Sequence, residues 1–365
     1  MSHNGNFLRR ALQAAAMLVP VATCAAAGRV VQAAGTGFNA DVGIDVYTLS
    51  VGDSSGSFAQ SVFFDGKYIW VGVQNPDGGA LLKMSQSGTL LSSTRVGTTP
   101  VEMAYDGANI WVSDYTSSDV TVVNQSGAVI ATFPRPGAEP EGILFDGKYV
   151  WTANNGPNAN TVSKFDPLNL SLMATYSVGL NPDGVAFDGS VIWVTNSYNN
   201  NVWTINRNTG AHINGWETGL YPLSIVYDGA NMWIGNGIHL GSVTKMRATD
   251  GAVLGTYATP GTTVRGLLYD GTSIWVCNSG SQTVSRLRAS NVALLGTYPT
   301  GPNPRSVAFD GTKIWIADSG ANTLTVLVPG SVAPPFPGVA RTVISQPAVV
   351  PAKSLGSVLN LLFAD

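Results

Sequence analysis

Seven near-copies of one short phrase run through this chain and constrain its fold more than any other feature. Each copy is an aromatic residue, Asp-Gly, two variable residues, an aliphatic residue or Met, and Trp. Successive Asp residues are separated by 41, 40, 42, 40, 42 and 40 positions. A period near 40 built from short β segments is typical of a β-propeller with one blade per repeat. The Asp/Trp pairs are Asp65/Trp70, Asp106/Trp111, Asp146/Trp151, Asp188/Trp193, Asp228/Trp233, Asp270/Trp275 and Asp310/Trp315.

One repeat divides into four predicted strands, which we take from the third copy. Apolar or alternating segments cover residues 142–145, 149–153, 161–165 and 172–176. Asp-Gly, a Gly/Asn/Pro loop and Asp-Pro separate them, and such residues mark turns. The sequence therefore predicts an all-β, seven-bladed β-propeller with four strands per blade.

The two ends of the repeat region predict how the ring closes. The last repeat stops at its third strand, 323–328, and residues 45–52 resemble a fourth strand that precedes the first repeat. We expect this N-terminal segment to be the outer strand of the last blade, which protects an otherwise open sheet edge. The propeller is then predicted to span residues 44–330.

Residues 1–27 resemble a secretion signal. Arg9 and Arg10 precede an apolar run, and three alanines at 25–27 offer a cleavage site. The sequence predicts export to the periplasm, the cell surface or the medium, with no transmembrane segment in the mature chain. Residues 28–43 are expected to form a linker, and residues 331–365 a Pro-rich linker followed by an apolar tail.

The composition limits the classes of partner. Removal of the signal leaves 17 basic residues against 22 acidic ones, a net charge of −5, which does not favour nucleic-acid binding. Cys277 is then the one remaining cysteine. We expect it to be a small buried residue, with no internal disulfide, in a monomeric propeller.

The repeated Asp and Trp residues have structural explanations. A large indole at one position of every blade is expected to pack between blades. The Asp of each Asp-Gly is expected to bond nearby backbone in its turn.

Candidate site residues follow from propeller geometry instead. The first residue of each innermost strand should ring the mouth of the central channel, where propellers usually meet ligands. Aligned five residues before each Asp, this ring is Gln60, Val101, Glu141, Asp183, Leu223, Arg265 and Arg305, with Glu102 one step further in and His239 on a neighbouring loop.

The charged members of this ring allow several interpretations. Glu141 and Asp183 suit a cation or an amine, whereas Arg265 and Arg305 suit a carboxylate or a phosphate. These side chains could equally pair with one another or with water. No zinc, phosphate-loop or nucleophile motif is present, so we expect no cofactor; a divalent cation on Glu102, Glu141 and Asp183 is the alternative.

The repeat phrase also resembles a known family. Residues 187–196, Phe-Asp-Gly-Ser-Val-Ile-Trp-Val-Thr-Asn, are similar to the YVTN-type repeats of secreted seven-bladed propellers. That resemblance implies a secreted or surface binding protein. The related virginiamycin B lyases use a His base and a Glu/His metal set, and here Glu102, Glu141 and His239 are the residues that could substitute.

The sequence therefore predicts an exported binding or scaffold module with contacts at the channel mouth. Two alternatives stay open. One is a metal-assisted lyase or hydrolase in the same channel, and the other is a structural cell-envelope component attached through its C-terminal tail.

Overall fold

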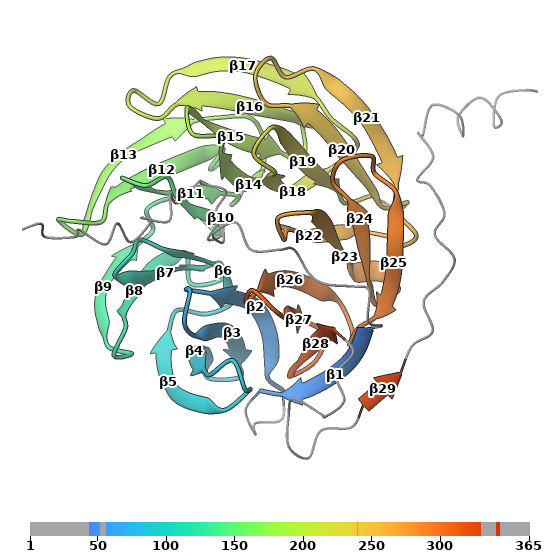
Figure 1. Cartoon of the computed structure of the whole chain (residues 1–365). Helices are drawn as coiled ribbons and strands as arrows, with labels where there is room; N and C mark the ends of the chain where they lie inside the picture. The colour runs from blue at the N-terminus through green and yellow to red at the C-terminus, as the bar shows by residue number, and fades with distance from the viewer. Residues whose placement is uncertain (1–43, 52–55, 239, 330–340, 344–365) are drawn as a thin grey trace, which may run out of the picture.

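The computed structural model describes residues 44–51, 56–238, 240–329 and 341–343. They form seven antiparallel sheets arranged around a common axis (Figure 1). Six sheets have four strands in sequence order, and the seventh has five. The predicted seven-bladed β-propeller is confirmed.

Each blade consists of strands that follow one another in the chain, and blade 7 also includes β1 and β29. Blade 1 is β2 (Phe58–Phe64), β3 (Ile69–Asn75), β4 (Gly78–Met84) and β5 (Leu90–Val96); blade 2 is β6 (Pro100–Tyr105), β7 (Asn109–Asp114), β8 (Asp119–Asn124) and β9 (Val129–Pro134). Blade 3 is β10 (Pro140–Phe145), β11 (Val150–Asn154), β12 (Thr161–Asp166) and β13 (Ser171–Ser177); blade 4 is β14 (Pro182–Phe187), β15 (Val191–Asn196), β16 (Asn201–Asn206) and β17 (His212–Glu217). Blade 5 is β18 (Pro222–Tyr227), β19 (Asn231–Asn236), β20 (Ser242–Arg247) and β21 (Val253–Ala258). Blade 6 is β22 (Val264–Tyr269), β23 (Ser273–Asn278), the short 3-10 turn η1 (Ser279–Ser281), β24 (Thr283–Arg288) and β25 (Leu294–Pro299). Blade 7 is β26 (Pro304–Phe309), β27 (Ile314–Asp318), β28 (Thr323–Pro329), β1 (Ile44–Ser50) and β29 (Arg341–Val343).

The ring closes as the sequence predicts. Strand β1 pairs antiparallel with β28 over its whole length, from Ile44 opposite Pro329 to Ser50 opposite Thr323. Strand β29 then adds a fifth strand outside β1, which the sequence did not indicate. The outer edge of blade 7 is thus covered by chain from both sides of the repeat region (Figure 1).

Each Asp-Gly phrase forms the same hydrogen-bonded turn. In blade 3, Oδ1 of Asp146 accepts the backbone N–H groups of Lys148 and Tyr149 at 2.8 and 2.7 Å. Oδ2 accepts the indole N–H of Trp151 at 2.9 Å. The glycine has a positive φ, 87° at Gly147, a conformation that favours glycine over other residues.

The seven repeat Trp side chains are buried and belong to the cores between blades, as predicted. All are at most 1% exposed. Trp193 stacks on Trp216 of the outer strand with ring centres 5.2 Å apart. Four lysines cross to the next blade and donate to its backbone, as Lys83 does to the Gln125 carbonyl at 2.6 Å. The others are Lys164, Lys245 and Lys313.

Cys277 is fully buried, as the sequence predicts. Over the described ranges, no helix is long and apolar enough to cross a membrane. The predicted signal, the 28–43 linker and nearly all of the 331–365 tail lie outside the described residues.

Candidate functional site

A β-bulge lies at the ring position of the innermost strand in every blade. In every blade the register between the innermost strand and its neighbour shifts near the start of the innermost strand, which marks a β-bulge. The shift falls between Pro140 and Ile143 in blade 3 and between Val264 and Leu267 in blade 6. Each of the seven predicted ring positions lies within such a shift. Bulges redirect side chains, and five of the seven positions line one pocket: Glu141, Asp183, Leu223, Arg265 and Arg305. Gln60 and Val101 do not line it.

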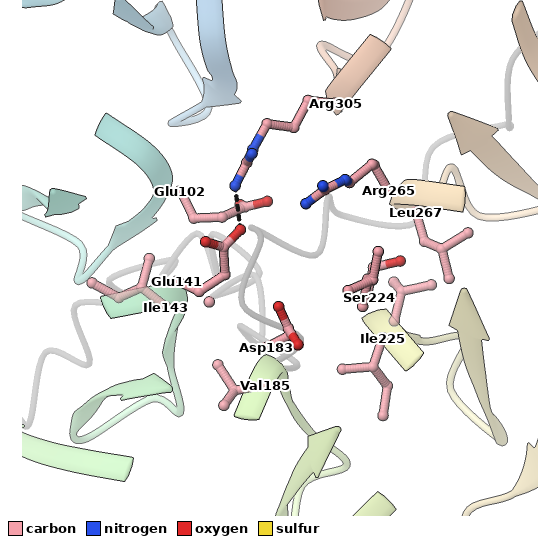
Figure 2. A pocket seen from close by; sticks show the side chains of 14 residues that line it. Glu102, Glu141, Ile143, Asp183, Val185, Ser224, Ile225, Arg265, Leu267 and Arg305 are labelled. Atoms are coloured by element: carbon pink, nitrogen blue, oxygen red, sulfur yellow. Dashed lines mark hydrogen bonds and ion pairs between the residues drawn. The ribbon is translucent and has the colours of Figure 1, made fainter. Parts of the chain in front are cut away.

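The structure brings five of the predicted site residues into one pocket at this level. They are Glu102, Glu141, Asp183, Arg265 and Arg305, and Figure 2 shows them around a common centre. Gln60 does not line the pocket, because its side-chain amide bonds Gln74 on the neighbouring strand at 3.2 Å. His239 lies outside the described residues.

Glu141 and Arg305 form an ion pair across the channel. Nη2 of Arg305, on β26, bonds Oε1 of Glu141, on β10 (Figure 2). The two side chains are 19% and 15% exposed, so water screens the pair only in part. The alternative that ring charges pair with one another is therefore realised for these two residues.

Asp183 is the most deeply buried of the charged ring residues. It is 5% exposed, and its Oδ2 atom has no hydrogen-bond partner within the part of the chain that the structure describes. Burial raises the pKa of Asp183 to about 8, and the nearby Glu141 carboxylate acts in the same direction. A side-chain hydrogen bond with Ser197 and the charges of Arg265 and Arg305 oppose this shift. At neutral pH the carboxyl group is therefore mainly protonated and able to donate a hydrogen bond.

Arg265 supplies the second guanidinium of the pocket. Arg265 is exposed to solvent, yet the protein around its guanidinium desolvates it in part and lowers its pKa, and the Arg305 charge lowers that pKa further. Among the described residues, Arg265 forms no ion pair and no hydrogen bond with a side chain or a carbonyl. In Figure 2 its guanidinium and the Asp183 carboxyl group both point toward the pocket centre.

A ring of aliphatic side chains lies next to the charged ring, and the sequence analysis did not select it. Ile143, Val185, Ile225 and Leu267 line the same pocket, and each is at most 9% exposed. They stand two residues after the charged ring, three before each repeat Asp. The sequence does indicate this ring, because the position three residues before each repeat Asp is aliphatic or Met in all seven repeats: Val62, Met103, Ile143, Val185, Ile225, Leu267 and Val307.

The pocket is small. Its free space is about 50 Å³. One water takes up roughly 10–15 Å³ of such space, so the pocket has room for about four water-sized groups. It suits one end of a ligand, whereas a complete drug-sized molecule needs roughly 300 Å³ or more.

The acidic residues here do not make a good site for a divalent cation. Within the described ranges, no three His, Cys, Asp or Glu residues come together as possible metal ligands. Glu141 is occupied by Arg305, and the two guanidinium groups place positive charge in the same space. The donor set of Glu102, Glu141 and Asp183 therefore does not fit the hard, oxygen-rich shell that such ions take.

Comparison with known proteins shows the fold and nothing finer. No family model and no curated protein matches the chain, so the YVTN-type resemblance is not confirmed. Among solved structures, hydrazine synthase of Kuenenia stuttgartiensis is similar with a TM-score of 0.64 and 17% identity, over 75% of this chain and 96% of that one.

Two lyases are similar to the same degree. A streptogramin B lyase has a TM-score of 0.64 and 18% identity, over 78% of this chain and 98% of that one. A catalytically inactive virginiamycin B lyase from Staphylococcus aureus, with quinupristin, has a TM-score of 0.64 and 15% identity, over 78% of this chain and 99% of that one. At such identities the likeness supports the propeller architecture, and function depends on the site itself.

Proposed function

We propose that this chain is an exported β-propeller binding module that contacts its ligand or partner at the channel mouth. The site is the pocket of Glu141, Asp183, Arg265 and Arg305. The observation that carries this proposal is the buried Asp183 carboxyl group, which lines the pocket together with Arg265 and whose Oδ2 atom has no hydrogen-bond partner among the described residues.

Polar groups held in this way are costly to a fold. A buried polar atom without a hydrogen bond destabilises the native state by about 1–3 kcal/mol, and most such atoms in proteins are satisfied. A ligand that bonds Asp183 and Arg265 would recover part of this free energy on binding. Perturbed carboxyl groups in a concave site are accordingly a common feature of binding and catalytic centres.

The test is ligand-dependent thermal unfolding of the chain and of a pocket variant. The panel contains divalent cations, amines, carboxylates, sugars and short peptides. A ligand at 100 times its Kd should add about 2.7 kcal/mol to the free energy of unfolding. We expect at least one shift that disappears in the double variant Glu141→Gln/Arg305→Gln and persists in Arg247→Gln, which changes an exposed residue of β20. A shift of equal size in all three proteins would place the binding elsewhere and contradict the proposal.

Export is tested separately by cell fractionation. Residues 1–27 carry the predicted signal, so the full chain should leave the cytoplasm and lose this segment. A chain that begins at residue 28 should stay inside. Recovery of uncleaved full chain in the cytoplasm would contradict export without affecting the pocket.

The lyase alternative shares its fold with two of the solved structures. The possible metal ligands Glu102, Glu141 and Asp183 do not favour a metal-assisted lyase. A thermal shift produced by divalent cations and lost in Glu141→Gln, together with turnover of a cyclic lactone, would replace the binding proposal with that alternative.

A further inference from the structure

The pocket offers one cationic group that is not committed to another side chain. Arg305 is bonded to Glu141, whereas Arg265 has no such partner in the described part of the chain. A guanidinium presents a planar fork of N–H donors that matches the two oxygens of a carboxylate. Arg265 therefore favours an anionic group on the ligand.

The other charges limit how much negative charge that group can carry. Glu102 and Glu141 line the same pocket, and both are acidic. A phosphate or a dicarboxylate would bring a second negative charge close to them, which costs free energy at short range. A single carboxylate needs only Arg265 and one further donor, which the Asp183 carboxyl group can provide in its protonated form.

The aliphatic ring determines what can be attached to this carboxylate. Ile143, Val185, Ile225 and Leu267 form an apolar wall beside the charged groups (Figure 2). With room for about four water-sized groups, the pocket holds a carboxylate and a short hydrocarbon. Contact of that hydrocarbon with the apolar wall is favourable because it leaves water.

We infer that the channel mouth binds the carboxylate end of a short aliphatic ligand, with the carboxylate between Arg265 and Asp183 and the hydrocarbon against Ile143, Val185, Ile225 and Leu267. This inference rests on the proposed function and specifies the ligand class of the same site. The chemistry is shared by a free short-chain acid and by the C-terminus of a peptide that ends in an aliphatic residue.

The surface beside the pocket bears on the choice between these two sources. Leu180, Tyr198 and Leu220 are exposed on loops that lead into or face β14 and β18. The rings of Tyr198 and Tyr221 lie 5.6 Å apart on the same side. A free acid would not reach these side chains, whereas a peptide that enters by its C-terminus would lie across them.

The test is calorimetric titration of the chain with three matched probes: propionate, propionamide and propylamine. We expect propionate to bind, and propionamide and propylamine to bind at least tenfold more weakly. Arg265→Gln should weaken propionate binding tenfold or more, and Arg265→Lys should weaken it less, because it keeps the charge and loses the fork. Arg247→Gln, an exposed arginine away from the pocket, should leave the affinity unchanged.

A second pair of probes separates the sources. The tripeptide Ala-Ala-Val is compared with its C-terminal amide. If the tripeptide acid binds more tightly than both its amide and propionate, the natural ligand is a peptide C-terminus. If the tripeptide acid binds as tightly as propionate or more weakly, the natural ligand is a free acid. Failure of both carboxylates to bind overturns the inference.

The outcomes also separate this inference from the proposed function. One outcome is that propylamine binds, that the carboxylates do not, and that Glu141→Gln abolishes propylamine binding. The channel mouth is then a ligand site for cations, and only the carboxylate inference is wrong. If no ligand of the wider panel depends on the pocket, both fail. Unchanged propionate affinity in folded Arg265→Gln and Arg265→Lys also overturns the inference, because the carboxylate then binds elsewhere.

Discussion

The indole N–H of Trp151 donates to Oδ2 of Asp146 at 2.9 Å, and the equivalent bond recurs in all seven blades at 2.7–2.9 Å. The same carboxylate also holds the turn through two backbone N–H groups. One acidic residue per repeat thus joins a tight turn to the largest core side chain. The recurring phrase therefore has the same structural role in every blade.

Removing this carboxylate should destabilise the propeller. Asp146→Ala leaves a buried indole N–H and two backbone N–H groups without their acceptor, and it breaks the 3.0 Å ion pair with Arg207. We expect a loss of about 3 kcal/mol in the free energy of unfolding. The matched change is Asp188→Ala, which loses the same kinds of hydrogen bond but no ion pair with a described residue. Urea unfolding should show that Asp188→Ala lowers the free energy of unfolding by about 1 kcal/mol less than Asp146→Ala does. Equal losses in the two variants would mean that the ion pair with Arg207 contributes nothing to stability.

Closure of the ring by β1 makes a second prediction. Tyr47 is 1% exposed and packs in the core of blades 7 and 1. Tyr47→Ala should lower the free energy of unfolding by about 3–5 kcal/mol through the cavity that it leaves. Thr48 is exposed on the same strand, so Thr48→Ala should change the free energy of unfolding by less than about 0.5 kcal/mol. Similar values for both variants in thermal unfolding would show that β1 does not complete the last blade.

The ion pair across the channel should contribute measurable coupling. A double-mutant cycle of Glu141→Gln and Arg305→Gln should give an interaction free energy of about 1 kcal/mol, because both side chains are mostly buried. Arg247 and Asp250 form an exposed pair at 2.8 Å, and the same cycle there should give about 0.3 kcal/mol. A coupling at the channel no larger than at the surface would mean that the pocket is open to water.

The raised pKa of Asp183 makes stability depend on pH. Its pKa is about 8 in the fold and roughly 3.9 in the unfolded chain. Between these pH values Asp183 binds more protons in the folded state than in the unfolded state. Its contribution to the free energy of unfolding therefore falls as pH rises from about 4 to 8 and is constant outside that range. The slope is at most about 1.4 kcal/mol per pH unit. The charged or titratable groups around Asp183 are Glu102, Glu141, Arg265, Arg305, Tyr115 and Tyr221.

Asp183→Asn removes this titration. The variant should become increasingly more stable than the unmodified protein as pH rises toward 8. Asp318→Asn serves as the comparison, because burial raises the pKa of Asp318 to about 7 and its window should end about one pH unit earlier. Parallel stability curves for the unmodified protein and Asp183→Asn between pH 4 and 8 would contradict the raised pKa.

The sequence predicted the fold closely because the repeat phrase marks the same turn in every blade. In blade 3 the predicted strands differ from β10–β13 by no more than two residues at either end. Counting strands also placed β1 correctly, since the last repeat lacked its fourth strand. Strand β29 was not predicted, because three residues, Arg341–Val343, carry no pattern and pair only through the edge that β1 provides.

The pocket was only partly predictable from sequence. Counting back from each Asp selected Glu141, Asp183, Arg265 and Arg305, because every blade places that position inside the same bulge. That Glu141 pairs with Arg305 depends on which blades face each other across the closed ring, and no local pattern encodes this distance. Gln60 does not line this pocket, and its amide bonds Gln74 instead. The aliphatic ring was overlooked although its alignment was visible.

A crystal structure of the chain grown with 2-bromopropionate tests whether a carboxylate binds at the channel mouth. We predict an anomalous bromine peak beside Ile143, Val185, Ile225 or Leu267, with the carboxylate bonded to Arg265 and Asp183. A well-ordered pocket that contains only water, or a bromine peak found only outside the channel, would contradict it.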